Sequence, residues 1–365
     1  MNRCRVILNE VTNLKSVGLC IRILRFAQDD TLFILGVALL FLCFPVSLHS
    51  QEPFRVMFWN VENLFDTKDD PRKNDNEFLP DAKRHWTPAR YRDKLEKVAK
   101  GIIASGNEFV PDLVGLCEVE NSSCLYDLTR HSPLREAGYR FVITDSSDQR
   151  GIDVALLYQP GSFKLITWQG IRIPHKQVKK GPTRDILHVV GKVPSGDTLD
   201  VFVCHMPSRS GGQEKSEPFR LLTADILKHA TDSVRGVRQH PYVLVMGDFN
   251  DYPSNKSMKI LSKGGALHNL MKGRRDGTYC YRGNWGVLDQ FLVSETMLKR
   301  KAGIRTSARA VQILRHPFLL DDKGGKPFRT YNGLKYQGGY SDHLPISLEM
   351  MLVTTHDDTD YYSEW

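Results

Sequence analysis

Short apolar runs typical of β-strands recur through most of this 365-residue chain, and they constrain its fold more than any other feature. They are rich in Val, Ile, Leu and Phe, and they cover residues 54–60, 113–118, 141–144, 154–158, 187–193, 199–204, 242–246, 290–293 and 344–351. Long helical periodicity occurs at residues 88–105 and 217–234. Many strands with few helices predict two packed sheets flanked by helices.

The stretches between these runs predict loops at residues 68–80, 208–216, 273–286 and 321–339. The sequence contains no internal repeat and no long low-complexity linker, so residues 51–352 are expected to form one domain. Residues 353–365 form an acidic tail that is expected to fray.

An uninterrupted apolar run occupies residues 32–46. A bilayer crossing takes about 20 apolar residues, so this run fits the core of a signal peptide better than a membrane anchor. We therefore expect residues 1–50 to be removed near Ser50 and the protein to be exported, either periplasmic or extracellular, without stable membrane insertion. An uncleaved anchor is the alternative. Asp29 and Asp30 lie where a signal peptide is usually positive, which a start codon downstream of Met1 would explain.

Composition narrows the class of protein. With 41% hydrophobic and 25% charged residues, the chain can bury a large core and does not resemble a disordered protein. Five of the 50 Lys and Arg and three of the 42 Asp and Glu lie in residues 1–50, which leaves a formal charge of +6 on the remainder. This excess suits an anionic ligand, although a solvated basic surface explains it equally well. Four cysteines remain after residue 50, which allows three disulfide pairings or, in apolar strands, buried thiols.

Polar residues with catalytic chemistry follow the ends of the apolar runs. Asn60 and Glu118 end two of them, His205 ends a third, and the run 242–246 leads into Asp248 and Asn250. Side chains at strand ends can converge on one rim, where sheets bind ligands.

A further motif, Ser341-Asp342-His343, precedes the last run. A base, an acid and a divalent cation held close together are what hydrolysis of a phosphate ester requires. The motif that contains Asp248 and Asn250 and the motif Ser341-Asp342-His343 together therefore indicate metal-assisted phosphoester hydrolysis.

At this point the chain resembles the endonuclease/exonuclease/phosphatase superfamily, which includes deoxyribonuclease I, apurinic endonucleases, inositol-phosphate phosphatases and bacterial sphingomyelinases. The resemblance covers residues 54–352 and is carried, in the family's order, by FWNVENLF, LVGLCEVEN, RGIDVALLY, CHMPSR, VMGDFND, WGVLDQFLVS and YSDHLPI. It implies an α/β (α+β) fold, a four-layer α-β-β-α sandwich of two mainly antiparallel sheets flanked by helices.

The resemblance also implies a metal site. Glu118 resembles the principal metal-binding glutamate, Asn60 a residue beside the metal and a phosphate oxygen, and Asp342 a second acidic residue at the metal. These oxygen donors suit Mg²⁺ or Mn²⁺, with Ca²⁺ as a further candidate. A glutamate or an asparagine at a strand end can also be merely exposed or cap a turn.

The remaining catalytic roles are implied in the same way. Asp248 resembles the carboxylate that activates water, and Asn250 resembles an amide that stabilises the transition state, although Gly-Asp-Phe-Asn is also a turn sequence. His343 resembles the catalytic histidine, oriented by Asp289. His205 resembles a second histidine that protonates the leaving oxygen.

Some assignments remain open at the level of sequence. We expect Asp153 to be the partner of His205, but it is equally well explained as a satisfied charge at a strand start. Arg150 and Arg209 are candidate phosphate-binding residues, and Tyr281 and Trp285 are candidates for stacking on bases. The arginines can instead be solvated charges, and the aromatic residues can pack their loop onto the sheet.

The sequence thus predicts an exported, monomeric endonuclease acting on DNA or RNA by direct attack of water on phosphorus. A phosphatase or phospholipid phosphodiesterase of the same superfamily is the alternative, because substrate class depends on loops. A catalytically inactive binding module is a more distant alternative.

Overall fold

The computed structural model of the protein describes residues 53–106, 108–174, 182–209, 211–300, 302–322 and 325–353. The expected signal peptide and nearly all of the acidic tail therefore lie outside the described residues. Within the described ranges, no helix has both the length and the apolar character needed to cross a bilayer.

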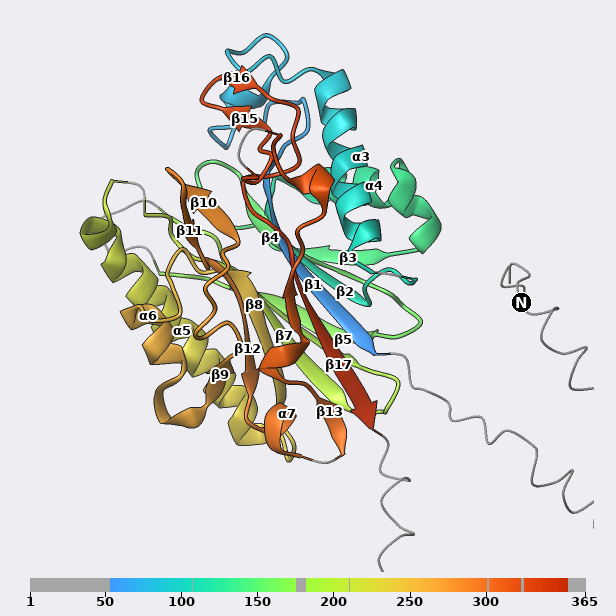
Figure 1. Cartoon of the computed structure of the whole chain (residues 1–365), viewed down its shortest axis with the longest axis vertical. Coiled ribbons are helices and arrows are strands. Elements are labelled where there is room, and N and C mark those ends of the chain that lie inside the picture. The colour runs from blue at the N-terminus through green and yellow to red at the C-terminus, as the bar shows by residue number, and fades with distance from the viewer. Residues whose placement is uncertain are drawn as a thin grey trace, which may run out of the picture. The chain divides into compact units, whose positions relative to one another are not determined.

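Two mixed sheets form the centre of the domain (Figure 1). The first runs in the order β13-β17-β1-β2-β4-β3, with β14 also on β17, from strands β1 (Phe54–Leu64), β2 (Leu113–Val119), β3 (Arg140–Ile143), β4 (Asp153–Tyr158), β13 (Gly303–Arg305), β14 (Val311–Ile313) and β17 (Ile346–Val353). The second runs in the order β5-β6-β7-β8-β12-β9, from β5 (Lys164–Ile171), β6 (Ile186–Lys192), β7 (Thr198–His205), β8 (Tyr242–Asp248), β9 (Leu267–Asn269) and β12 (Asp289–Ser294). The pairs β1–β2 and β7–β8 are parallel, whereas the other neighbours are antiparallel.

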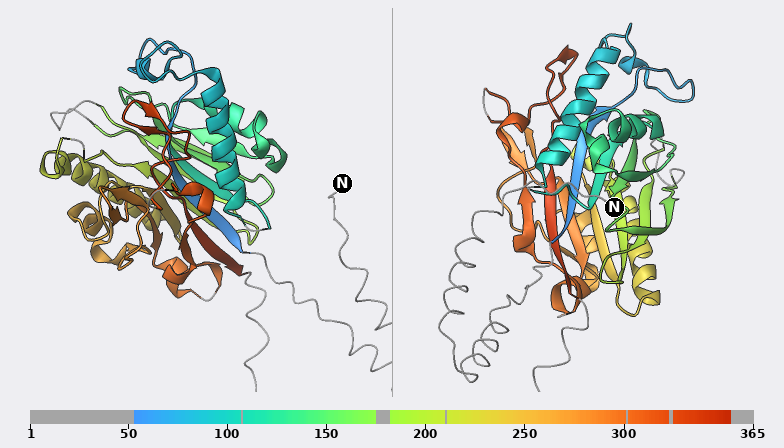
Figure 2. Two further views of the ribbon diagram at one scale, coloured as in Figure 1. Left: turned by 45° about the horizontal axis from the view of Figure 1, so that its top comes forward. Right: turned by 90° about the vertical axis from the view of Figure 1, so that its right-hand side faces the viewer.

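Helices cover the outer faces of both sheets (Figures 1 and 2). Helices α3 (Pro88–Ala104) and α4 (Ser122–Arg130) lie over the first sheet, and α5 (Gln213–Val237) and α6 (Lys256–Leu261) lie over the second. The described residues also form the short helix α7 (Thr296–Lys299) and two hairpins, β10 (Tyr279–Tyr281) with β11 (Asn284–Gly286) and β15 (Tyr331–Asn332) with β16 (Lys335–Tyr336). This arrangement confirms the predicted α-β-β-α sandwich.

Strand β1 shows how the sequence builds these layers. Successive side chains of a strand point to opposite faces, so Val56 and Phe58 enter the core between the sheets, while Met57 and Trp59 pack under the helices. The Trp59 ring lies where a side chain at Gly101 of α3 would be, because a β-carbon there would come within 2.5 Å of the ring. The buried strand and the helix therefore approach closely.

The second sheet sets the register of three polar residues. In the parallel pair β7–β8, His205 lies opposite Asp248, and in the antiparallel pair β12–β8, Asp289 lies opposite the same residue. A β-carbon on Gly247 would come within 2.4 Å of the Cys204 carbonyl oxygen, so only glycine fits between the strands before Asp248.

Several local predictions were wrong. Helix α5 begins at Gln213, inside the predicted loop 208–216, and it contains Pro218. Arg220 stabilises this first turn by donating to the Ser216 side chain and the Gln213 carbonyl. Strand β5 was not predicted because it is an edge strand with mostly exposed side chains, and the predicted loops 273–286 and 321–339 contain the two hairpins.

The cysteines are free thiols. Cys117, Cys124 and Cys204 are buried and Cys280 is partly buried, and none of the four forms a disulfide. The three pairings that the sequence allowed are therefore not formed, and the buried-thiol alternative describes the strand residues.

Candidate active site

Asp248 lies between two histidines at the rim of the second sheet. Its Oδ2 atom is 3.6 Å from Nε2 of His205 and 3.8 Å from Nε2 of His343. Glu118, from the first sheet, brings its Oε1 atom to 3.9 Å from the same His205 nitrogen. Residues separated by more than two hundred positions therefore meet in one site, as the strand-end pattern predicts.

Two asparagines hold the Asp248 carboxylate. Asn60 donates from Nδ2 to Oδ2 at 3.1 Å, and the backbone N–H of Asn250 donates to Oδ1 at 2.9 Å. The Asn60 side-chain oxygen accepts from the N–H of Glu62, and the Asn250 side chain donates to the Met206 carbonyl. Both side chains are thus fixed in orientation. Asp248 is held by the side chain of Asn60 and by the backbone of Asn250, whereas the side chain of Asn250 is committed to the Met206 carbonyl.

His343 is held on three sides. Its Nδ1 atom is 2.8 Å from Asp289, its backbone N–H donates to Ser341, and its carbonyl accepts from the Trp59 indole at 2.9 Å. The ring of Tyr279 lies against the imidazole with the ring centres 4.8 Å apart. Asp289 therefore directs the other ring nitrogen toward Asp248.

The pKa values of these groups move in different directions. Burial raises the pKa of Asp248 to about 6, although the nearby His343 opposes this rise. Burial by itself lowers the pKa of His343, but the carboxylates of Asp289 and Asp248 outweigh it and raise that pKa well above its usual value. Burial, followed by the positive charges of Arg184 and Arg150, lowers the pKa of His205 well below its usual value. Such separation is typical of acid–base sites.

The backbone at the site is strained. Glu118, Asn250, Glu62 and Asn63 have φ values of 62°, 49°, 49° and 56°, in the left-handed region that side chains other than glycine seldom adopt. Such residues gather at functional sites, where the surrounding structure compensates for their cost. Oε2 of Glu118 accepts from the Asn63 N–H, which ties the two strained segments together.

Asp342 has a cationic partner. Its Oδ2 atom accepts from Arg329 at 2.7 Å, and Arg329 also lies 3.6 Å from Glu62. Beside them Lys94 is 1% exposed and donates to Thr330 and the Tyr340 carbonyl. Burial lowers the pKa of Lys94 to about 8. Arg329 and Lys94 were not predicted, because neither belongs to a recognisable motif.

His205 and Asp153 do not form the expected pair. Asp153 accepts from Thr144 and from the Ser146 N–H, which satisfies it as a charge at a strand start. The Nδ1 atom of His205 is buried without a hydrogen-bond partner. The unexpected neighbour is Arg184, which is 6% exposed and donates to the Met206 carbonyl; no sequence signal identified it.

The two arginines predicted to bind phosphate differ. Arg150 is about half exposed and lies 3.7 Å from Asp148. Arg209 is largely committed to the protein, because it donates to the Asn250 carbonyl, Asp251 and Asn255 and stacks on Tyr252. Arg209 thus positions the loop behind Asn250.

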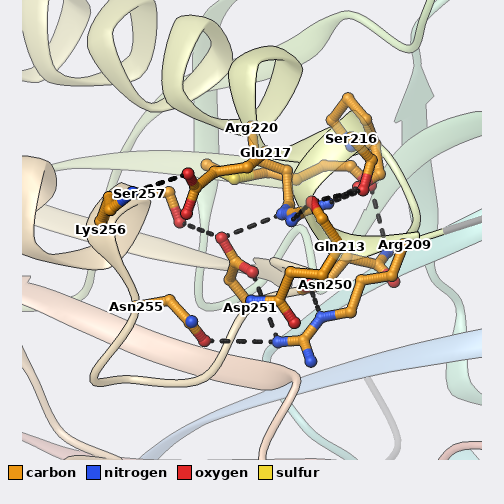
Figure 3. A network of polar contacts seen from close by, with 12 residues as sticks. Arg209, Gln213, Ser216, Glu217, Arg220, Asn250, Asp251, Asn255, Lys256 and Ser257 are labelled. Atoms are coloured by element: carbon orange, nitrogen blue, oxygen red, sulfur yellow. Dashed lines mark hydrogen bonds and ion pairs between the residues drawn. The ribbon is translucent and has the colours of Figure 1, made fainter.

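A buried ion pair supports the same loop (Figure 3). Nε of Arg220 is 2.9 Å from Oδ2 of Asp251, and both side chains are almost completely buried. Ser257 donates to the same carboxylate at 2.7 Å. Asp251 therefore joins α5 and α6 to the end of β8.

The aromatic residues of the β10–β11 hairpin also differ. Tyr281 is 58% exposed, with the Arg282 guanidinium 5.3 Å from its ring centre. Trp285 is partly buried under Arg315, 4.2 Å away. It lines a cavity of about 400 Å³ with residues that include Tyr252, Lys272 and Arg275.

With this geometry established, comparison with known proteins assigns the family. Residues 55–352 match the family model described as the Endonuclease/Exonuclease/phosphatase family. The chain belongs to this family. No match was found among curated protein sequences.

Solved structures share the fold of this family member. Three similar ones are the catalytic domain of human nocturnin with bound sulfate (19% identity, TM-score 0.53, covering 82% of this chain and 93% of that one), a mannosyl-6-phosphatase from Bacteroides thetaiotaomicron (15%, 0.53, 82% and 100%) and D. rerio TDP2 with a single-strand DNA product (13%, 0.51, 82% and 99%). At such identities they show the fold alone. The family assignment makes the protein a metal-dependent phosphoesterase.

The residues present fit a divalent metal. Glu118 offers an oxygen toward the centre of the site, and the ligand atoms of Asp248, Asp289 and His343 lie within 4.8 Å of one another. A donor set dominated by carboxylates suits a hard divalent cation.

Proposed function

We propose that the protein is a divalent-metal-dependent phosphodiesterase, an endonuclease that cleaves DNA or RNA after export. The observation that supports hydrolysis is the position of Asp248, fixed by two asparagines and 3.6–3.8 Å from two histidines of opposite pKa shift. Export rests on the apolar run 32–46 of the sequence.

In this proposal Asp248 takes the proton of the attacking water. Its pKa of about 6 makes it largely ionised at neutral pH, yet a better base than an ordinary aspartate. Asn60 and Asn250 keep its oxygens in place, so that little reorganisation is needed when water attacks phosphorus.

The two histidines take different roles. His343 is kept protonated by Asp289 and Asp248, so it is the better proton donor to the leaving oxygen. His205 is kept neutral by burial and Arg184, which argues against the proton-donor role that the resemblance implied. We assign it instead a hydrogen bond to a phosphate oxygen.

Glu118, with Asn60 and Asp342 nearby, would hold Mg²⁺ or Mn²⁺. When bound, the ion supplies positive charge that neutralises the phosphate and stabilises the transition state. Arg329 already compensates Asp342, which makes Glu118 the principal ligand in this proposal.

Tyr281 supports a nucleic acid substrate. Tyr279 and Tyr281 share one face of β10, because they are two residues apart in a strand. Tyr279 contacts His343, and the exposed Tyr281 ring follows two residues further along the same strand face, next to Arg282. An exposed ring next to a cation is suited to stacking on a base while phosphate is bound.

A phosphatase acting on a small phosphorylated molecule is the second candidate. The cavity beside Trp285 supports it, because about 400 Å³ suits a small ligand and Lys272 and Arg275 line it. No observation in the described residues favours a phospholipid substrate.

The test is turnover of plasmid DNA, RNA, inositol phosphates, sugar phosphates and sphingomyelin by the purified protein with Mg²⁺ or Mn²⁺. Asp248→Ala and His343→Ala should each reduce turnover by about 100-fold or more. Tyr281→Ala should weaken cleavage of nucleic acid by about tenfold but leave a small phosphate monoester unaffected. Turnover of small monoesters alone would replace the nuclease proposal with the second candidate.

A further inference from the structure

A second group of carboxylates lies beyond the ends of β1 and β2. We define the acidic cluster as Asp66, Asp75 and Glu120. Ligand atoms of Asp66, Glu120 and the Cys124 thiol lie within 4.8 Å of one another. The Asp66 N–H donates to Glu120 Oε2 at 2.7 Å, and the Cys124 sulfur lies 3.8 Å from that oxygen.

Asp75 carries an oxygen without a partner. The residue is 2% exposed, and while its Oδ2 accepts from the Asp70 N–H, its Oδ1 is buried with no hydrogen bond. The Asp75 carboxyl lies within hydrogen-bonding reach of the Glu120 carboxyl. Two carboxyl groups therefore face each other inside the protein.

No cationic side chain compensates this cluster. Among the described residues, none of its three carboxylates forms an ion pair with Lys, Arg or His. Three other buried aspartates do: Asp251 pairs with Arg220, Asp148 with Arg184, and Asp200 with Arg238. A buried carboxylate is stable when a partner or a metal balances its charge, so the acidic cluster lacks a component that the other sites contain.

We propose that the acidic cluster binds a hard divalent cation, for which Ca²⁺ is the probe, at a site separate from the catalytic metal. Three carboxylates supply the oxygen ligands that such an ion prefers, and the free Asp75 oxygen is one of them. Asp66 and Asp75 belong to the loop after β1, while Glu120 precedes α4. The ion therefore fastens this loop to the segment between β2 and α4.

Terbium luminescence tests the proposal on the full chain. The Trp86 indole donates to the Phe65 carbonyl, next to Asp66, so excitation of Trp86 should sensitise Tb³⁺ bound in the cluster. The experiment uses a Glu118→Gln background, which removes the principal ligand proposed for the catalytic metal. We expect a signal that Ca²⁺ displaces, that falls several-fold in Trp86→Phe, and that is lost in Asp75→Asn and Glu120→Gln.

Asp81→Asn is the matched control, because Asp81 is an exposed acidic residue of the same region of the chain. This variant should bind Tb³⁺ and Ca²⁺ as the unchanged background does. In the Glu118→Gln background, Ca²⁺ at 100 times its Kd should raise the Tm by about 5 °C, and Asp75→Asn should abolish the rise. Circular dichroism confirms that the variants fold, and Asp66→Asn replaces any variant that does not. The proposal is overturned if this background binds no Tb³⁺ or Ca²⁺, or if the variants retain both signal and Tm shift.

Discussion

Asp251 and Glu120 are both buried carboxylates that follow a strand bearing candidate catalytic residues, yet their surroundings differ. Asp251 receives the Arg220 guanidinium at 2.9 Å and Arg209 at 3.3 Å (Figure 3). Glu120 instead faces two further carboxylates and a thiol. One loop carries its own counterions, whereas the other does not.

This difference determines what each loop depends on. The loop behind Asn250 is held by ion pairs within the chain, so Asn250 should keep its position at Asp248 whether or not divalent cations are present. The loop that holds Asp66 and Asp75 should become more ordered when a cation binds. Removing the Arg220 charge beside Asp251 should therefore lower the stability of the protein, whereas removing the Glu120 charge in the acidic cluster should not.

Arg220→Met should have the largest effect on stability. It leaves the Asp251 carboxylate buried without its principal partner, and breaking a buried pair in this way costs about 3–5 kcal/mol. The measurement is the free energy of unfolding in urea. Lys256→Ala is the control, because Lys256 forms an exposed pair with Glu217 and the loss of such a pair should hardly change stability. Equal losses in both variants would contradict the role given to Arg220.

Asp153 provides an intermediate case, a buried carboxylate held by neutral donors. Burial raises its pKa to about 6, above an unfolded value of about 4. The folded state therefore holds this proton more tightly, so the stabilising contribution is present below about pH 4 and is lost as pH rises through 6.

Asp153→Asn should accordingly be more stable than the wild type at pH 7, by on the order of 2–3 kcal/mol, and similar to it at pH 4. An asparagine oxygen can still accept from Thr144 and Ser146. Urea unfolding of both proteins at pH 4, 5.5 and 7 checks this, and a difference that does not vary with pH would refute it.

Ser257→Ala should have a smaller effect. Ser257 donates one hydrogen bond to the Asp251 carboxylate, which already has two arginines, so about 1.5 kcal/mol of unfolding free energy is expected to be lost. The same urea measurement applies. A loss as large as that of Arg220→Met would mean that the hydroxyl, not the ion pair, holds the loop.

Glu120→Gln, measured in a chelator, should have the smallest effect. The amide oxygen can still accept from the Asp66 N–H, while repulsion with the neighbouring carboxylates disappears. We expect the free energy of unfolding to be unchanged or higher, by less than about 1 kcal/mol. A large loss in chelator would show that the cluster is balanced from within, like Asp251.

Much of the candidate active site could be predicted from the sequence. Asn60, Glu118, His205 and Asp248 each lie at the end of an apolar run, and strand ends of packed sheets converge. Their contacts within 4 Å follow from the register of β7 and β8 and the facing of the two sheets. The local periodicity of these runs specifies that register.

Other features could not be predicted in this way. The sequence left Asp153 open between a partner of His205 and a satisfied charge at a strand start, and the structure shows the second, because Asp153 accepts from Thr144 and Ser146. Arg209 was a candidate phosphate-binding residue, yet it is committed to the loop behind Asn250. Such pairings depend on which side chains meet across the sandwich, and no local pattern encodes them.

By itself, the sequence determined most of the central strands, the layers and which residue types stand at the strand ends, because alternation of apolar side chains fixes which face of each strand is buried. Only the tertiary structure decided the charge balance of each buried carboxylate. Desolvation and counterions come from residues distant in the chain, so the pKa of Asp248, the protonation of His343 and the uncompensated acidic cluster emerge only when the two sheets and their loops have packed.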